Sequence, residues 1–236
     1  MMQIQLTKKP KNVTLIEGFP GFGLVGTIAT EYLLQHLKCE QIGSFWLEEM
    51  PATVVVHDGK FIPPIGLYYN KEYNIVIVHA ISGTMGVEWM LADYIHEIAK
   101  QLTAQEIITI EGVGAAEDSE ESHVFYYTTN QKKKEQLKKL GVNPLQEGII
   151  IGVTSALLLK TKIEMITLFA DTHSKLPDSK AAAKVIEVLD KYLGLKIDPK
   201  PLVLTAEKFE KKLQDILEKS KITTEQVKEK QMNYVG

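Results

Sequence analysis

A glycine loop near the amino terminus has the spacing of a phosphate-binding turn. Gly21, Phe22, Gly23 and Gly26 lie in the run GFGLVG, which matches the pattern G-x-G-x-x-G. The run follows a β-branched segment and precedes a helical one, the context in which amides at a helix N-terminus bind a pyrophosphate. The acidic residues at a suitable distance to bind a ribose are Glu40, Glu48 and Glu49. The same glycines equally suit a tight strand-to-helix turn that packs closely on a sheet, and the stiff Pro20 favours that alternative.

A second group of polar residues lies at or just past the ends of apolar runs. Its members are His79, Glu111, Asp171 and His173. Ligands of open α/β sheets gather beyond the carboxyl ends of the strands, so two histidines and two carboxylates could form an acid–base or metal site there. Polar residues at strand ends also serve as caps and loop residues. We therefore expect no catalytic residue, no bound metal and no cofactor, and keep the enzyme as the alternative.

Alternating strands and helices must position both groups. We expect strands at residues 13–17, 42–47, 53–57, 65–69, 73–80, 107–110, 124–129, 148–153 and 163–170. We expect helices at residues 24–37, 87–102, 132–140, 154–160 and 178–193, and a loop at 112–123. This order predicts an α/β protein with a mixed sheet covered on both faces. Asp58-Gly59 predicts a hairpin, and hence antiparallel strands, within residues 53–80.

Composition and charge exclude several classes of protein. The 236 residues are 44% hydrophobic and 24% charged, as in ordinary globular proteins, and the single cysteine excludes an intrachain disulfide and a cysteine-rich zinc site. Every basic residue is a lysine, which disfavours nucleic-acid binding because arginine is the residue that recognises bases and phosphates bidentately. We expect no secretion signal in the polar residues 1–12 and no membrane span. The expected location is cytoplasmic.

The carboxyl-terminal part differs from the rest of the chain. We expect an α/β/α domain at residues 1–198, and an amphipathic helix with a flexible tail at 199–236, after Pro199 and Pro201. Residues 1–130 hold 7 lysines against 16 acidic residues, and residues 131–236 hold 20 against 14. This polarity suits head-to-tail self-association, and it equally suits two solvated faces.

The run LIEGFPGFGLVGTIATEYL at residues 15–33 resembles the signature of the proteasome assembly chaperone superfamily, in its archaeal branch. The segments that agree with it are EEMPA at 48–52, HA at 79–80 before the helix at 88–99, EGVG at 111–114, GIIIG at 148–152 with LLL at 157–159, and LFADTH at 168–173 before PDSKAA at 177–182. Together they cover about residues 12–195.

This resemblance implies a three-layer α/β/α sandwich similar to nucleoside phosphorylases, without their activity. It implies a closed homo-oligomer, from trimer to pentamer, that helps to assemble or cap the proteasome core particle. Such proteins dock between α-subunits through a terminal hydrophobic–Tyr–any tripeptide. The corresponding partner-binding residues here are Asn233, Tyr234, Val235 and Gly236, with the tyrosine third from the end and a polar residue before it. The tail is therefore either a variant anchor or a terminus without that role.

Two functions follow. The first is a non-enzymatic assembly chaperone or scaffold that docks through its tail. The second is an enzyme, similar to ATP-grasp ligases or to nucleoside phosphorylases, that uses the glycine loop and the polar residues at the strand ends to bind a nucleotide or metal.

Overall fold

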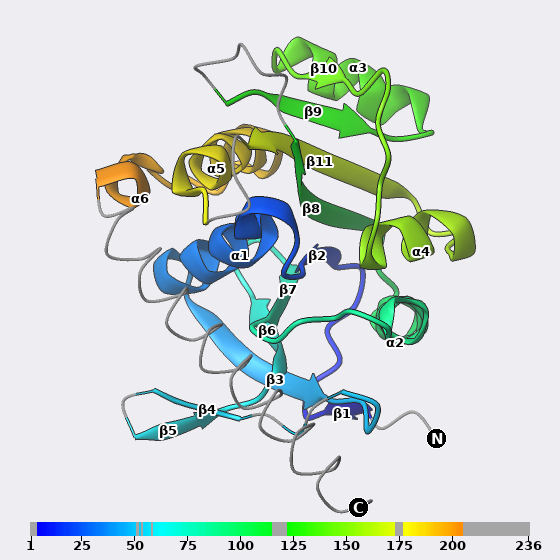
Figure 1. The fold of residues 1–236 in the computed structure, drawn as a ribbon, viewed down its shortest axis with the longest axis vertical. Helices are drawn as coiled ribbons and strands as arrows, with labels where there is room; N and C mark the ends of the chain where they lie inside the picture. Colours follow the sequence, from blue (N-terminus) through cyan, green and yellow to red (C-terminus); the bar gives the residue numbers. More distant parts are fainter. Residues whose placement is uncertain are drawn as a thin grey trace, which may run out of the picture.

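A mixed nine-stranded sheet forms the centre of the computed structural model, which describes residues 4–50, 52, 54–57, 59–114, 122–172 and 177–204 (Figure 1). In order across the sheet the strands are β1 (Ile4–Leu6), β3 (Cys39–Phe45), β6 (Ile65–Asn70), β7 (Ile75–Ala80), β2 (Thr14–Gly18), β8 (Glu106–Gly114), β11 (Met165–Thr172), β9 (Val124–Tyr127) and β10 (Asn143–Pro144).

The four central strands, β7, β2, β8 and β11, are parallel. Their register places Glu17 of β2 beside Thr109 of β8, and Thr109 beside Thr167 of β11. Antiparallel strands β6, β3 and β1 extend the sheet on one side. The predicted hairpin forms from β4 (Val55–His57) and β5 (Lys60–Ile62), which make a separate two-stranded sheet that projects at the lower left of Figure 1.

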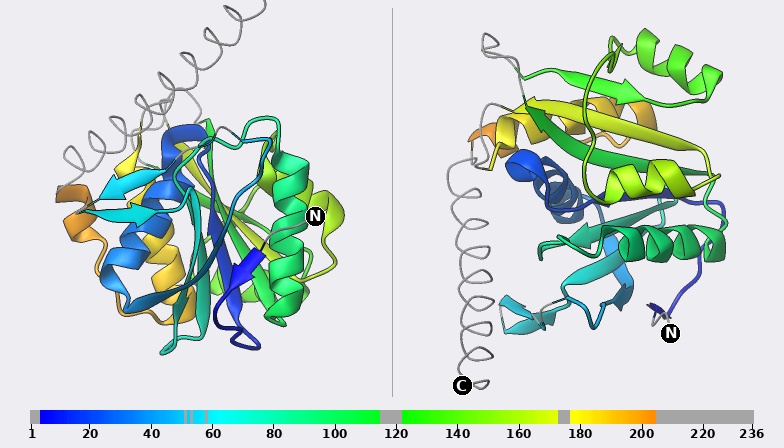
Figure 2. Two further views of the ribbon diagram at one scale, coloured as in Figure 1. Left: turned by 90° about the horizontal axis from the view of Figure 1, so that it is seen from below. Right: turned by 45° about the vertical axis from the view of Figure 1, so that its right-hand side comes forward.

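Helices cover both faces of the sheet. Helices α1 (Val25–His36) and α5 (Ser179–Leu193) pack on one face, and α2 (Glu88–Gln101) and α4 (Val153–Lys160) pack on the other (Figure 2). We call these the α1/α5 face and the α2/α4 face. Helix α3 (Gln131–Lys139) lies beside β9 and β10. The predicted three-layer α/β/α sandwich with a mixed sheet is confirmed.

Two hydrophobic cores lie on opposite faces because side chains alternate along each strand. On β2, Ile16 packs with α1 and α5, whereas Leu15 packs with α2 and α4. The central strands are buried on both faces, which explains their nearly continuous apolar runs in the sequence. Helix α5 begins where the Asp178 side chain accepts a hydrogen bond of 2.9 Å from the Ala181 amide, and it ends at Gly194 with a φ of 68°.

Two expectations for secondary structure were wrong. Residues 148–152 form no strand: they cross the carboxyl edge of the sheet irregularly and lead into α4 at Gly152, whose φ is 103°. Ile149 and Ile151, which suggested a buried strand, are 88% and 79% exposed. Residues 112–114 belong to β8 rather than to a loop, because they continue its pairing with β11. The short outer strands β1 and β10 had no sequence signal.

The start of the carboxyl-terminal segment packs on the sandwich. Helix α6 (Lys200–Leu204) contacts α5, and Leu202 is buried in the core of the α1/α5 face. The predicted amphipathic helix and tail beyond residue 204 lie outside the described residues. No helix in the described part of the chain is long and apolar enough to cross a membrane.

Candidate functional site

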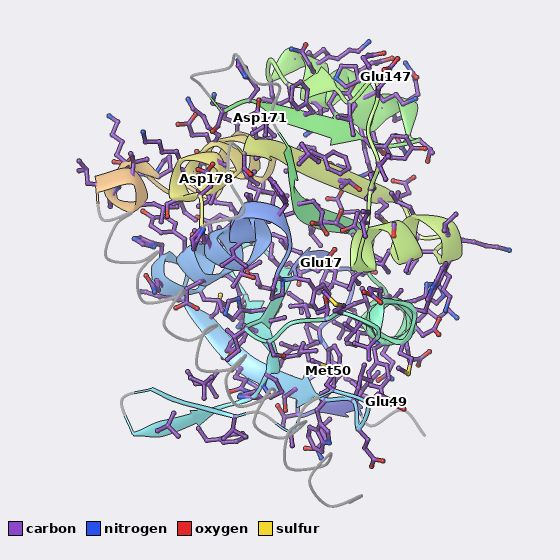
Figure 3. The ribbon with its side chains drawn as sticks, in the orientation of Figure 1. Glu17, Glu49, Met50, Glu147, Asp171 and Asp178 are labelled. Carbon is purple, nitrogen blue, oxygen red and sulfur yellow. The ribbon has the colours of Figure 1, made fainter. Side chains whose placement is uncertain are left out.

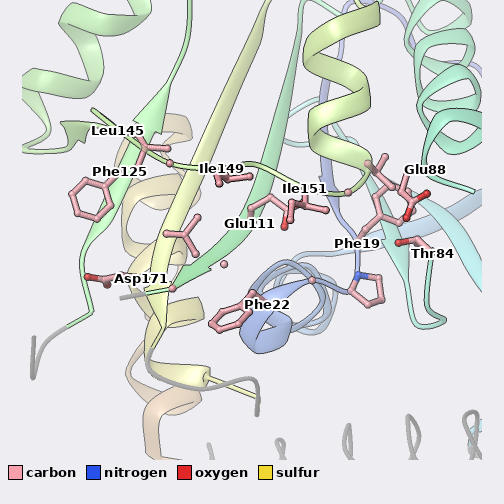
Figure 4. A pocket seen from close by; sticks show the side chains of 18 of the residues that line it. Phe19, Phe22, Thr84, Glu88, Glu111, Phe125, Leu145, Ile149, Ile151 and Asp171 are labelled. Carbon is pink, nitrogen blue, oxygen red and sulfur yellow. The ribbon is translucent and has the colours of Figure 1, made fainter. Parts of the chain in front are cut away.

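A pocket of about 1000 Å³ lies at the carboxyl edge of the parallel strands (Figure 4). The turn after β2 contributes Phe19 and Phe22, the segment after β7 contributes Thr84, and the end of β8 contributes Glu111. The crossing segment 144–153 closes another side. This is the edge where open α/β sheets bind their ligands.

Two buried carboxyl groups meet beside this pocket. Glu111 is 8% exposed and Glu17 is fully buried, both on the α2/α4 face. The Thr154 hydroxyl, at the start of α4, lies 2.8 Å from Glu111 Oε1 and 3.3 Å from Glu17 Oε1. Since this hydroxyl has one hydrogen to donate, one of the two carboxyl groups must be protonated for both contacts to be hydrogen bonds.

Burial changes the protonation of both groups. Desolvation raises the pKa of Glu111 from its ordinary value of 4.5 to about 7, although the hydrogen bond from Thr154 acts in the opposite direction. Desolvation, and after it the nearby Glu111 carboxylate, raise the pKa of Glu17 well above its ordinary value. Burial therefore favours the protonated form of Glu17, while Glu111 exchanges its proton near pH 7.

Asp171 lies on β11 and lines the same pocket. It accepts a hydrogen bond from the His123 amide, and its Oδ2 lies 3.3 Å from His123 Nδ1. Figure 4 shows Asp171 and Phe125 at one end of the pocket, Thr84 and Glu88 at the other, and Glu111 between them.

The predicted strand-end group is therefore only partly brought together. Glu111 and Asp171 share the pocket, whereas His79 faces the α1/α5 face, where its ring nitrogens contact Thr30 Oγ1 at 2.9 Å and Glu31 Oε2 at 3.1 Å. His79 points to the wrong face because residues 75, 77 and 79 of β7 share one side. His173 lies outside the described residues, as do Asn233, Tyr234, Val235 and Gly236.

The glycines of the loop make close backbone contacts. A Cβ on Gly26 would lie 2.6 Å from the carbonyl oxygen of Ile110, and one on Gly23, whose φ is 62°, would lie 2.9 Å from Thr172 Cγ2. Gly23 and Gly26 are therefore explained by the close packing of α1 and its preceding turn against the sheet, which leaves no room for a side chain at either position. Gly21 and Phe22 instead line the pocket, and a Cβ on Gly21 would lie 2.7 Å from Glu111 Oε2.

The charges of the pocket are acidic. Among the described lining residues, the carboxylates belong to Glu88, Glu111, Glu147 and Asp171, and none of those residues is a lysine. A phosphate group would be repelled there, which disfavours a nucleotide. Glu40, one of the predicted ribose-binding residues, lies on β3 and forms an ion pair with Lys8 instead. Within the described ranges, no three or more His, Cys, Asp or Glu side chains are grouped to hold a metal ion.

Sequence reasoning missed Glu17 and Thr154. Figure 3 shows Glu17 in the interior, whereas Glu49 and Glu147 lie at the periphery. A glutamate inside the apolar run Val13–Gly18 was a usable signal, because a charged residue is almost never fully buried without a partner. Thr154 gave no such signal, because a threonine at the start of a helix is common.

The fold and the pocket together define an α/β/α sandwich protein with a ligand-sized acidic and apolar pocket at the carboxyl edge of its sheet. A model of the PAC2 family matches residues 15–217, and the chain belongs to that family. The resemblance expected from residues 15–33 is thereby confirmed.

Solved structures and a curated relative are similar to this chain over most of its length. The crystal structure of Pyrococcus furiosus PbaA, an archaeal homolog of proteasome-assembly chaperone, is 29% identical, has a TM-score of 0.85, and the match covers 95% of this chain and 100% of PbaA. Pyrococcus furiosus PbaB, an archaeal proteasome activator, is 24% identical with a TM-score of 0.75, covering 91% and 98%, and shows the shared fold. The uncharacterized protein MJ0106 of Methanocaldococcus jannaschii is 28% identical over 211 residues, covering 88% of this chain and 87% of the relative.

Proposed function

We propose that this protein is a non-enzymatic, cytoplasmic chaperone or scaffold for the proteasome core particle. The observation that carries the proposal is membership of the PAC2 family together with full-length similarity to PbaA, a homolog of proteasome-assembly chaperone. The protein works as a closed homo-oligomer, from trimer to pentamer, and the oligomer presents several copies of the carboxyl-terminal tail to its partner.

Exposed apolar side chains support self-association. Trp89 on α2 is 54% exposed and Leu159 on α4 is 75% exposed. The Lys160 ammonium lies 5.4 Å from the centre of the Trp89 ring, so the two helices share one partly apolar surface. The projecting hairpin adds the exposed Val56 and Phe61. Exposed apolar patches of this kind are typical of protein interfaces.

The tail is the proposed docking element. Tyr234 would enter a pocket between α-subunits, and the terminal carboxylate of Gly236 would pair with a lysine there. Several tails on one oligomer raise the effective concentration of each, so a weak variant anchor is sufficient for docking.

Native mass measurement tests the proposal. We expect one closed oligomer of the protein alone, and a heavier complex after mixing with archaeal proteasome α-subunits. Deletion of residues 234–236 should abolish the complex and leave the oligomer intact, whereas Gln231→Ala, three residues before the tyrosine, should leave both. A wild-type oligomer that gains no mass with α-subunits at any salt concentration would refute the proteasome role. Docking that survives the deletion would refute only the tail.

A further inference from the structure

The pocket at the carboxyl edge combines apolar walls with acidic groups. Phe22, Phe125, Ile149 and Ile151 line it, and the two isoleucines are largely exposed because they face the pocket and its opening rather than the core (Figure 4). A volume of about 1000 Å³ accommodates a drug-sized molecule or a short piece of peptide. Such walls favour a ligand with an aromatic or aliphatic body.

The polar groups of the pocket select the sign of the ligand's charge. Its four carboxylates come from different elements: Glu88 from α2, Glu111 from β8, Glu147 from the crossing segment and Asp171 from β11. They are spread along the pocket, and no group of three among the described residues could hold a metal ion. The histidine of the lining, His123, is already engaged by Asp171. The charge of the described lining residues therefore favours an organic cation over a metal or an anion.

Glu111 offers the innermost acceptor. Its Oε1 is occupied by the Thr154 hydroxyl at 2.8 Å. Its Oε2 lies beside Gly21, where the absence of a side chain leaves the carboxylate open, and no described residue donates a hydrogen bond to it. Because Glu111 as a whole is more than nine-tenths buried yet lines the pocket, its Oε2 is an acceptor that a ligand in the pocket can reach.

We propose that this pocket binds a primary amine carried on an aromatic or aliphatic body, with the ammonium group at Glu111 Oε2 and the body between Phe22, Phe125 and Ile151. The site does not depend on the proposed docking of the tail. The amine belongs either to a free small molecule or to a lysine side chain of a hydrophobic peptide.

The buried carboxyl pair makes binding depend on pH. The pKa of Glu111 is about 7, so an ammonium ion binds best after Glu111 has lost its proton. Among the described residues, the other titratable groups that face Glu111 or share its pocket are Glu17, Glu88, Glu147, Asp171 and His123. The protonation of Glu17 matters because a second buried negative charge would oppose ionisation of Glu111.

Calorimetric titration with 2-phenylethylamine tests the proposal, with 2-phenylethanol and phenylacetate as the neutral and anionic probes of matched shape. We expect the amine to bind at pH 8 and to lose about tenfold in affinity at pH 6, because most of Glu111 is then protonated. The alcohol should bind at least about tenfold more weakly and the acid not measurably. Equal or tighter binding of phenylacetate, or no binding of the amine at either pH, would overturn the proposal.

Variants locate the amine within the pocket. Glu111→Gln keeps the hydrogen-bond acceptor for Thr154 and should weaken amine binding at pH 8 about tenfold while removing its pH dependence. A pH dependence that persists in this variant would assign the effect to another group, such as His123, and would contradict the proposal. Ile151→Ser should weaken binding at both pH values without changing their ratio. Glu187→Gln, on the exposed surface of α5, is the matched control and should bind as the wild type does.

A further titration, with peptides as probes, distinguishes the two sources of the amine. The probe is N-acetyl-Phe-Lys-Phe-amide, compared with the same peptide acetylated at the lysine side chain. Tighter binding of the unmodified peptide than of 2-phenylethylamine, lost on acetylation, assigns a lysine segment as the ligand. Tighter binding of the small amine assigns a metabolite. Equal binding of both peptides would refute recognition of the ammonium group.

Discussion

Each face of the central strands carries a hydrophobic core, but the two faces differ toward the carboxyl ends of β8 and β11. On the α1/α5 face, β8 presents Ile108 and Ile110, and β11 presents Leu168, all of them within one hydrophobic core. On the α2/α4 face, the same strands present Thr109 and Thr167 in one row and Glu111 one step further along. Both faces are equally buried, so exposure to water does not explain the difference.

The buried polar side chains on the α2/α4 face, which we call the polar row, lower the free energy of unfolding, whereas the apolar side chains on the α1/α5 face do not. Within the described residues, Glu17 Oε2, Thr109 Oγ1 and Thr167 Oγ1 are buried without a hydrogen-bond partner. Each such group costs roughly 1–3 kcal/mol. A polar row retained at this cost beside a pocket is typical of a functional site, whereas the α1/α5 face serves to hold the sheet and helices together.

The largest effect should come from the apolar face. Leu168→Ala removes a side chain that is 1% exposed between β11 and α5. We expect the free energy of unfolding to fall by about 3–4 kcal/mol, because the lost burial adds to the cavity left behind. Chemical denaturation monitored by circular dichroism measures this. A loss below about 1 kcal/mol would mean that the core relaxes around the cavity and that the two faces differ less than proposed.

The second prediction concerns the pH dependence of stability, which the carboxyl groups of the α2/α4 face should cause. Glu17 and Glu111 hold their protons more tightly in the folded chain than in the unfolded chain, so the folded state binds more protons. The contribution of Glu111 is complete below pH 4.5 and is lost as the pH rises through about 7, and the contribution of Glu17 is likewise lost as the pH rises. For Glu111 the total change is about 3 kcal/mol, from roughly 1.4 kcal/mol for each pKa unit.

Glu111→Gln tests this sign. The variant should match the wild type near pH 4.5 and be more stable by about 3 kcal/mol at pH 8, because its amide stays neutral. Denaturation curves across pH 4–9 provide the comparison. Glu164→Gln, a half-exposed residue outside the pocket, serves as the control. Wild-type stability that rises with pH would show that the carboxyl pair is ionised in the folded protein.

A third change probes the glycine loop on the apolar face. Gly26→Ala would press a methyl group against the Ile110 carbonyl oxygen at 2.6 Å and Gly18 Cα at 2.9 Å. We expect a loss of about 2 kcal/mol, since overpacking exceeds the gain in helix propensity. Gly114→Ala, which meets open space, should change stability by less than about 0.5 kcal/mol. Equal effects of the two substitutions in thermal unfolding would remove packing as the explanation for Gly26.

The sequence predicted the apolar face better than the polar one. Short continuous apolar runs predicted the central strands, which are buried on both faces, and apolar residues at helical spacing predicted the helices α1, α2 and α5. Predicting the residues of the pocket required knowing which side of its strand each polar residue faces. Asp171 and Glu111 were placed at the correct edge, but His79 lies on the other face, since one residue of shift reverses the side. Within the crossing segment, a strand was wrongly predicted at residues 148–153 because apolar residues that line a pocket resemble those of a core.

The smallest expected effect is a gain on the polar face. Thr167→Val keeps the shape of the side chain and removes a buried hydroxyl that has no partner among the described residues, so the protein should become about 1 kcal/mol more stable. Thr154→Val provides the matched comparison, because its hydroxyl bonds Glu111 and the variant should lose about 1 kcal/mol. If Thr167→Val raises the stability and Thr154→Val lowers it, the hydroxyl groups of the polar row contribute to stability only where they contact the Glu17–Glu111 pair. A loss from both would mean that Thr167 has a partner, such as a buried water, and that the whole row forms one network.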